Sequence, residues 1–257
     1  MPSYYSSLKK ISLKSKSAIF YLQLIQKLMK FFGGILDLIY PLVCINCGNS
    51  LVTHETVICT FCSVKLPVTN FHNDPVNDMA KALWGRVNID FATAFLYFRK
   101  AGITQKLLHQ LKYKGRQDIG INLGTRFGNH LKENRFVSSA DYLIPVPLHI
   151  SKKKARGFNQ SQLICEGLSQ SLGIPVSENN LMRISYTDTQ TKKKRFERWL
   201  NVSEKFILKE PEVLEGKRIL LVDDVFTTGA TMEACCHKLN EVKNISIGVA
   251  SLAIAAH

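Results

Sequence analysis

Acidic side chains are scarce in this sequence. Its 257 residues contain 20 aspartates and glutamates against 34 lysines and arginines, so the formal net charge is +14. Such an excess of cations indicates an anionic partner, either a nucleic acid or a polyphosphate ligand. Charge alone does not choose between these two classes.

Long apolar runs are missing as well. No stretch approaches roughly 18 uninterrupted apolar residues, so we expect no transmembrane helix. The chain also lacks internal repeats and extended low-complexity segments. Hydrophobic residues nevertheless make up 46% of the sequence, which is enough to build a globular core.

The amino-terminal region lacks the features of a cleaved targeting signal. Residues 1–17 are rich in Lys and Ser, and no clean small-residue cleavage site follows the apolar run AIFYLQLI at 18–25. We expect residues 1–34 to form a basic extension that is partly helical or disordered. A peripheral contact with a membrane surface remains open for it.

The seven cysteines are too sparse for a secreted disulfide scaffold, which favours a reducing, cytoplasmic setting. Four of them form two CxxC pairs, Cys44 with Cys47 and Cys59 with Cys62. Each pair can form a knuckle whose sulfurs point at one metal, and two knuckles complete a closed tetrahedral site of the structural kind.

The cysteine spacing therefore predicts a zinc ribbon-like module over residues 35–68, with zinc as a structural cofactor. The alternative is two CxxC pairs without metal. His54 lies between the pairs and is either a rival ligand or an ordinary surface histidine.

From Phe91 onward, segments typical of strands alternate with segments of helical periodicity. Strands are predicted at 91–98, 142–147, 218–223 and 245–254, and helices at 103–113, 118–132, 159–173 and 230–242. This alternation predicts an α/β domain over 91–257, with a mostly parallel sheet flanked by helices. Residues 69–90 are expected to be a linker and packing segment. Ligands of such sheets bind outside the carboxyl ends of the strands.

The stretch ILLVDDVFTTGAT, residues 219–231, places an acid pair at the end of a predicted buried strand. Asp223 and Asp224 can accept hydrogen bonds from vicinal hydroxyls or hold a divalent cation through water. The small residues that follow can turn backbone N–H groups and threonine hydroxyls toward a phosphate, where the next helix begins. The two patterns GxxxxGK[ST] and GxGxxG are absent. Acidic side chains that can bind hydroxyl groups, next to a loop that can bind a phosphate, predict a site for ribose 5-phosphate.

This stretch closely resembles the signature of the type I phosphoribosyltransferases, which use phosphoribosyl pyrophosphate (PRPP). The segments IPVPLHISKKKARGFNQSQLI and TDTQTKKKRFERWLNV resemble internal motifs of the ComF family, a bacterial phosphoribosyltransferase-like group linked by name to competence for DNA uptake. The resemblance runs from about Asp37 to the carboxyl terminus, and the family typically carries an amino-terminal zinc module. It implies that PRPP is bound with Mg²⁺ by Asp223, Asp224, Val225, Thr227, Thr228, Gly229, Ala230 and Thr231.

The basic segment SKKKARGFNQ, residues 151–160, resembles the ComF-family loop that would meet the pyrophosphate of PRPP. Arg156 can grip a phosphate with two hydrogen bonds, and Gly157 permits an unusual backbone conformation. Asn159 and Gln160 can donate side-chain hydrogen bonds. The alternative is a solvated basic loop. A second basic stretch, HQLKYKGRQ at 109–117, is interpreted as the solvated end of a helix.

Residues 187–201 combine cations with Trp199. By its place in the resemblance this segment is a candidate lid, with Lys194, Arg195 and Arg198 closing over the substrate and excluding water. The same composition suits single-stranded nucleic acid.

Two functions therefore follow from the resemblance. One is a phosphoribosyltransferase in which Asp223, Asp224 and Arg156 serve catalysis on an unknown acceptor. The other is a non-catalytic PRPP sensor that binds single-stranded DNA and proteins of the competence machinery. The sequence does not indicate the oligomeric state.

Overall fold

The computed structural model describes residues 41–183 and 206–255. The amino-terminal extension and the candidate lid with Lys194, Arg195 and Arg198 lie outside the described residues. Within the described part, no helix has the length and apolar character needed to span a membrane.

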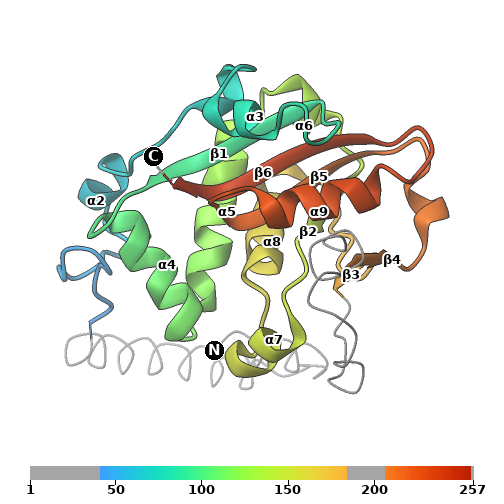
Figure 1. The fold of residues 1–257 in the computed structure, drawn as a ribbon. Helices are drawn as coiled ribbons and strands as arrows, with labels where there is room; N and C mark the ends of the chain where they lie inside the picture. Colours follow the sequence, from blue (N-terminus) through green and yellow to red (C-terminus); the bar gives the residue numbers. More distant parts are fainter. Residues whose placement is uncertain (1–40, 184–205, 256–257) are drawn as a thin grey trace, which may run out of the picture.

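A four-stranded parallel sheet forms the centre of the molecule (Figure 1). Its order is β1 (Phe91–Phe98), β6 (Ser246–Ala255), β5 (Arg218–Phe226) and β2 (Tyr142–Pro145). The expected α/β class with a parallel sheet is confirmed. β5 runs three residues further than predicted, so the acid pair belongs to the strand itself and Asp223 pairs with Ser251 of β6.

Helices cover both faces of this sheet. One face packs against α4 (Ile103–Tyr113), α5 (Gln117–Leu131) and α8 (Gln160–Leu172). In Figure 1, α4 and α8 lie below the strands and α5 passes behind them. The other face packs against α3 (Asp78–Leu83) and α9 (Ala230–Leu239). Because side chains alternate along a strand, Leu220 joins the first core and Leu221 the second.

Glycines bring α5 and α8 into close contact. A Cβ at Gly124 would collide with the carbonyl oxygen of Ile164, and a Cβ at Gly167 would collide with that of Ile121. The two helices therefore pack backbone to backbone, which fixes the amino terminus of α8 beneath the end of β5.

The segment between the cysteines and β1 contributes to the core. It contains α2 (Thr60–Val64), the short 3₁₀ turn η2 (Phe71–Asn73) and α3, which Asn77 caps by accepting from the Ala80 N–H at 3.0 Å. Met79 of α3 is fully buried against the sheet. The helix α3 has only six residues, so its sequence shows little helical periodicity.

One local prediction was wrong. Residues 150–156 form the helix α7 (Ile150–Arg156) and not a loop, and the helix ends at Gly157 with a positive φ of 81°. β3 (Leu181–Arg183) and β4 (Phe206–Leu208) form a separate antiparallel pair. Two further short elements are α6 (Arg135–Ser138) and η5 (Pro211–Leu214).

Candidate functional site

The acid pair at the end of β5 is held by side chains from two helices. The hydroxyl of Ser161, in the first turn of α8, donates to Asp223 Oδ1 at 3.1 Å, and the Asp224 N–H donates to the same oxygen at 2.8 Å. Lys112, in the last turn of α4, places its ammonium 2.8 Å from Asp224 Oδ2. The two sequence-predicted acids therefore lie together at the carboxyl edge of the sheet.

Asp223 has an altered protonation equilibrium. Burial and the neighbouring charge of Asp224 raise the pKa of Asp223 to about 7, although hydrogen bonds from Asp224 and Ser161 and the charge of Lys112 act in the opposite direction. At neutral pH this carboxyl group is thus close to half-protonated. A bound group that donates hydrogen bonds or carries positive charge would favour its ionised form.

Lys112 corrects the interpretation of residues 109–117 as a solvated helix end. Its side chain is 21% exposed and Asp224 is 15% exposed, so the ion pair is largely withdrawn from water. Lys112 and Ser161 were missed because nothing local in the sequence joins them to the acids. The one signal in the sequence was the pair of adjacent acids at a strand end, because two buried carboxylates need a cation from elsewhere in the chain to balance their charge.

The loop between β5 and α9 has the form expected of an anion cradle. Thr227, Thr228 and Ala230 are exposed, and the first turn of α9 leaves N–H groups without intrahelical partners. Gly229 caps this helix with a φ of 78°. A Cβ at Gly229 would lie 2.8 Å from the Phe226 ring, so glycine is required both by conformation and by space.

Arg86 supports this loop from outside the predicted motif. Its guanidinium donates to the carbonyl of Thr228 at 3.1 Å and to that of Ala82 at 2.9 Å, and it pairs with Glu233 of α9. The threonine loop is therefore tied both to the end of α3 and to the first turn of α9. Arg86 lies in the segment expected to be a linker, which gave no indication of this contact.

The basic segment over α7 reaches the same edge of the sheet. Arg156 donates to Gln160 Oε1 at 2.7 Å, and its guanidinium carbon lies 5.5 Å from the centre of the Tyr113 ring. The Gln160 side chain is buried, and its Nε2 has no hydrogen-bond partner in the described part of the chain. Asn159 instead uses both polar atoms internally, donating to the Val146 carbonyl and capping α8 through the Ser161 N–H.

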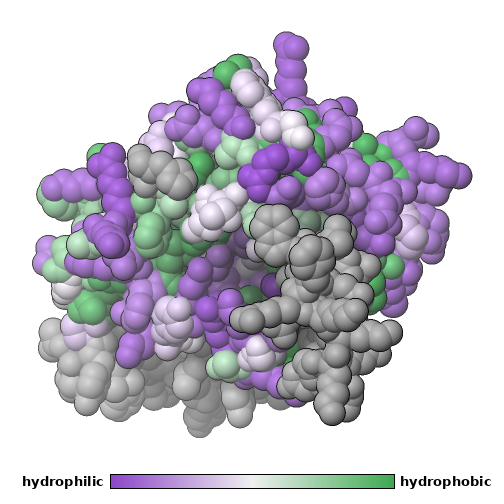
Figure 2. Space-filling model, viewed as in Figure 1, coloured by the Kyte–Doolittle hydropathy of each residue, from purple (hydrophilic) through white to green (hydrophobic). Residues whose placement is uncertain are grey.

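Two cavities adjoin the acid pair. One of about 410 Å³ is lined by Lys112, Tyr113, Asp224, Val225 and Thr227, among others. The second, of about 450 Å³, is lined by Lys112, Tyr113, Gly115, Lys152, Ala155 and Arg156. They share Lys112 and Tyr113, so the acid pair and the basic helix α7 face one continuous region. In Figure 2, hydrophilic side chains surround a hollow beside α4.

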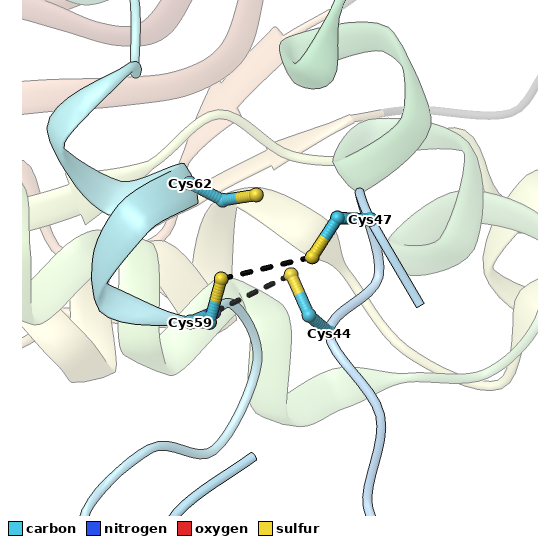
Figure 3. Close-up of side chains that lie close together, drawn as sticks. All are labelled: Cys44, Cys47, Cys59 and Cys62. Carbon is cyan, nitrogen blue, oxygen red and sulfur yellow. Dashed lines mark hydrogen bonds between the residues drawn. The ribbon is translucent and has the colours of Figure 1, made fainter. Parts of the chain in front are cut away.

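The four CxxC cysteines form a second cluster (Figure 3). All four sulfurs lie within 4.8 Å of one another, and Cys47 Sγ is 3.7 Å from Cys59 Sγ. Burial acts to raise the pKa of Cys44, but hydrogen bonds from nearby backbone N–H groups outweigh it and lower the pKa to about 6. His54 is exposed and outside the cluster. Four converging sulfurs fit a tetrahedral metal site.

The cysteine module packs into the main core. Val57 and Ile58 are buried in the same apolar cluster as α4 and α5. Residues 67–69 also pair with the outer edge of β1, through the Thr69 N–H to the Phe95 carbonyl at 3.0 Å and the Tyr97 N–H to the Pro67 carbonyl at 2.8 Å. The module therefore covers an edge strand as well as holding a cysteine cluster.

The parallel sheet and the acid-threonine turn after its core strand define a phosphoribosyltransferase-like protein, and residues 146–257 match the model of the phosphoribosyl transferase domain. The chain is 30% identical over 194 residues to DNA utilization protein YhgH of Escherichia coli strain K12, covering 74% of this chain and 80% of that protein. It is 32% identical over 142 residues to competence protein ComFC of Bacillus subtilis strain 168, covering 53% of each. The chain belongs to the ComF family.

Two further proteins are similar to this chain over part of their length. DNA utilization protein YhgH of Salmonella typhimurium is 32% identical over 129 residues, which is 49% of this chain and 56% of that protein. The chain thus spans little more than half of the length of this relative. Among solved structures, purine phosphoribosyltransferase from Pyrococcus horikoshii Ot3 is 19% identical, covering 52% of this chain and 72% of that chain with a TM-score of 0.33.

Proposed function

We propose that this chain binds PRPP with Mg²⁺ at the carboxyl edge of the sheet, and recognises or transfers its ribose 5-phosphate in a process linked to DNA uptake. The observation that carries this proposal is the juxtaposition of the largely buried acid pair with the exposed threonine loop. The names of its relatives, competence protein and DNA utilization protein, support the biological link.

The two halves of a ribose phosphate would be held by different chemistry. Asp223 and Asp224 would accept hydrogen bonds from the ribose hydroxyls, and the uptake of such donors would favour the ionised form of Asp223. The loop of Thr227, Thr228 and Gly229, with the first turn of α9, would bind the 5-phosphate through N–H and hydroxyl groups. Arg86 would keep the loop in place through its bond to the Thr228 carbonyl.

The pyrophosphate would lie toward α7. Arg156 and Lys152 line the cavity on that side, and the free Nε2 of Gln160 is a hydrogen-bond donor without a partner in the described residues. In a transfer reaction the acceptor nucleophile forms a bond to C1 of the ribose while the C1–oxygen bond to pyrophosphate breaks. The departing pyrophosphate gains the negative charge, which these cations would stabilise. Mg²⁺, when bound with PRPP, supplies further charge neutralisation.

The cysteine cluster is proposed to hold a structural zinc ion. Cys44, Cys47, Cys59 and Cys62 supply four thiolate ligands, which leaves no open position for substrate. The Asn46 side-chain amide donates to Cys62 Sγ at 3.3 Å and the Cys59 N–H to Cys44 Sγ at 3.4 Å, as expected around metal-bound thiolates.

The test of ligand binding is the melting temperature with PRPP and Mg²⁺. We expect a rise for the unchanged protein and none for Asp223→Asn with Asp224→Asn. The matched control is Asp74→Asn with Asp78→Asn, two exposed acids, which should keep the rise. An unchanged melting temperature of the natural protein at millimolar PRPP and Mg²⁺ would refute the proposal.

The second candidate is a PRPP sensor that does not turn over and acts on single-stranded DNA. The net charge of +14 favours this function because it supports electrostatic binding to a polyanion. Incubation with PRPP and a pool of candidate nucleophiles separates the two, since pyrophosphate release requires transfer or hydrolysis. For DNA, binding to a single strand should weaken steeply between low and high salt.

A further inference from the structure

A larger cavity lies at the opposite edge of the sheet. Its volume is about 650 Å³, and none of its lining residues lines the cavities at the acid pair. It opens beside Phe91, the first residue of β1, whereas the acid pair lies at the carboxyl ends of the strands. Since β1 has eight residues, the two edges are about 25 Å apart. The cavity is therefore a separate feature.

Two aromatic rings form part of its wall. Phe91 and Phe136 are stacked with ring centres 5.4 Å apart and an interplanar angle of 15°, and both remain partly exposed. Phe136 lies directly over Gly248 of β6, where any Cβ would collide with the ring, and Arg218 lies over the same ring at 5.3 Å. The rings are thus fixed by the sheet, and both residues line the cavity.

Two cations stand at the rim of this cavity. Lys132 and Arg135 line it and are exposed, and neither side chain has an ion pair or a hydrogen bond within residues 41–183 and 206–255. Among the described residues that line the cavity, one side chain is acidic: that of Glu133, which lies between the two cations in sequence and is also exposed. The pair therefore leaves net positive charge available to an anion.

The remaining wall is held in place by its own contacts. The Asn134 side chain donates to the carbonyl of His72 at 3.0 Å, which ties η2 to the start of α6. His72 packs edge-to-face against His130 at a ring separation of 6.0 Å, and His130 in turn contacts Phe95 at 5.2 Å. These contacts fix the positions of the residues that line the cavity.

We propose that this cavity is a second binding site, which takes a nucleotide: a planar base joined to a phosphate. The stacked Phe91 and Phe136 supply a surface for the base, and Lys132 with Arg135 supply the charge for the phosphate. The side-chain amides of Asn73 and Asn129 line the same space and can pair with base edges. The volume falls in the range of small-ligand sites. The nucleotide is either free or one unit of a single strand.

The experiment measures binding of two probes to the full chain at low salt: dAMP by calorimetry, and fluorescein-labelled (dT)12 by anisotropy. The variant Lys132→Ala with Arg135→Ala removes the cations without breaking an ion pair or side-chain hydrogen bond of the described residues. The matched control, Lys209→Ala with Lys243→Ala, removes the same charge from exposed positions elsewhere. Asp223→Asn with Asp224→Asn reports binding at the other edge, and Phe91→Leu removes one ring but keeps an apolar side chain.

We expect Lys132→Ala with Arg135→Ala to lower the affinity for the probe at least tenfold. Phe91→Leu should lower it at least fivefold. The control pair should stay within twofold of the natural protein. If the Lys132/Arg135 variant loses dAMP binding, the ligand is a free nucleotide. If this variant loses only (dT)12 binding, the ligand is a polynucleotide. The proposal is overturned if neither probe binds, if the Lys132/Arg135 variant binds within twofold, or if inorganic phosphate competes as well as dAMP.

Discussion

Replacement of Asp223 by Asn is expected to stabilise the folded protein while removing ligand binding. The Asp223 carboxyl lies at the end of a core strand beside Asp224, and its pKa is raised from an ordinary value of 3.8 to about 7. An Asn side chain can still accept from the Ser161 hydroxyl and the Asp224 N–H through its Oδ1. It carries no charge, so the cost of placing a second anion there is removed.

The magnitude follows from the two pKa values. Between pH 3.8 and 7 the unfolded chain has lost the Asp223 proton while the folded protein keeps it, so the free energy of unfolding of the natural protein falls as pH rises. The difference in pKa corresponds to about 4 kcal/mol. Because the residue keeps a small exposure to water, screening reduces the expected gain for Asp223→Asn above pH 7 to about 2–4 kcal/mol. The gain should shrink as pH falls, because both states then carry a neutral side chain.

The assay is urea unfolding of both proteins at pH 5, 6, 7 and 8. The stability difference should increase by about 2–3 kcal/mol from pH 5 to pH 7 and change little above that. Asp74→Asn, at an exposed position, controls for the effect of an amide substitution alone. A difference for Asp223→Asn that stays constant across this pH range would refute the reasoning.

Binding of PRPP, lost in this variant, should tighten in the natural protein from pH 6 to pH 8, because the ionised carboxylate accepts hydrogen bonds from the sugar hydroxyls.

Three further outcomes are expected. Gly229→Ala should lower the free energy of unfolding by about 1–3 kcal/mol and abolish the PRPP-dependent rise in melting temperature, whereas Gly216→Ala, with a similar φ of 67° but open space around it, should cost less and keep the rise. Arg86→Met should weaken PRPP binding at least fivefold in titration calorimetry, because the Thr228 loop loses its support; unchanged affinity would show that the loop holds its form alone. Cys59→Ser should lose stoichiometric zinc in elemental analysis and lower the melting temperature, since the module shares the main core; full zinc content in this variant would argue against a four-cysteine site.

The strands and long helices were predictable because their signals are local. The apolar run from Ile219 to Val222 predicted a buried strand, and the structure places the acid pair that follows it within the last four residues of β5. The CxxC spacing likewise predicted four converging sulfurs. The helix α7 was missed because its apolar positions are few, and its residues were assigned to a loop from a family resemblance.

The partners of the site residues were not predictable in the same way. Lys112 is separated from Asp224 by more than a hundred residues, and Arg86 is still further from the loop that it supports. Ser161 reaches Asp223 because glycine contacts bring α8 close against α5. No periodicity within a segment reports such contacts, since they depend on how whole elements pack.

The amino-acid sequence by itself determined which segments become strands and helices, where the backbone turns beside Gly229, and which residues carry acid, hydroxyl and thiol chemistry. These properties depend on neighbours within a few positions along the chain. Tertiary structure alone decided that Lys112 faces Asp224, that Arg86 holds the threonine loop, and that burial raises the pKa of Asp223. Desolvation and charge pairing act through space, so they exist only after distant segments have packed together.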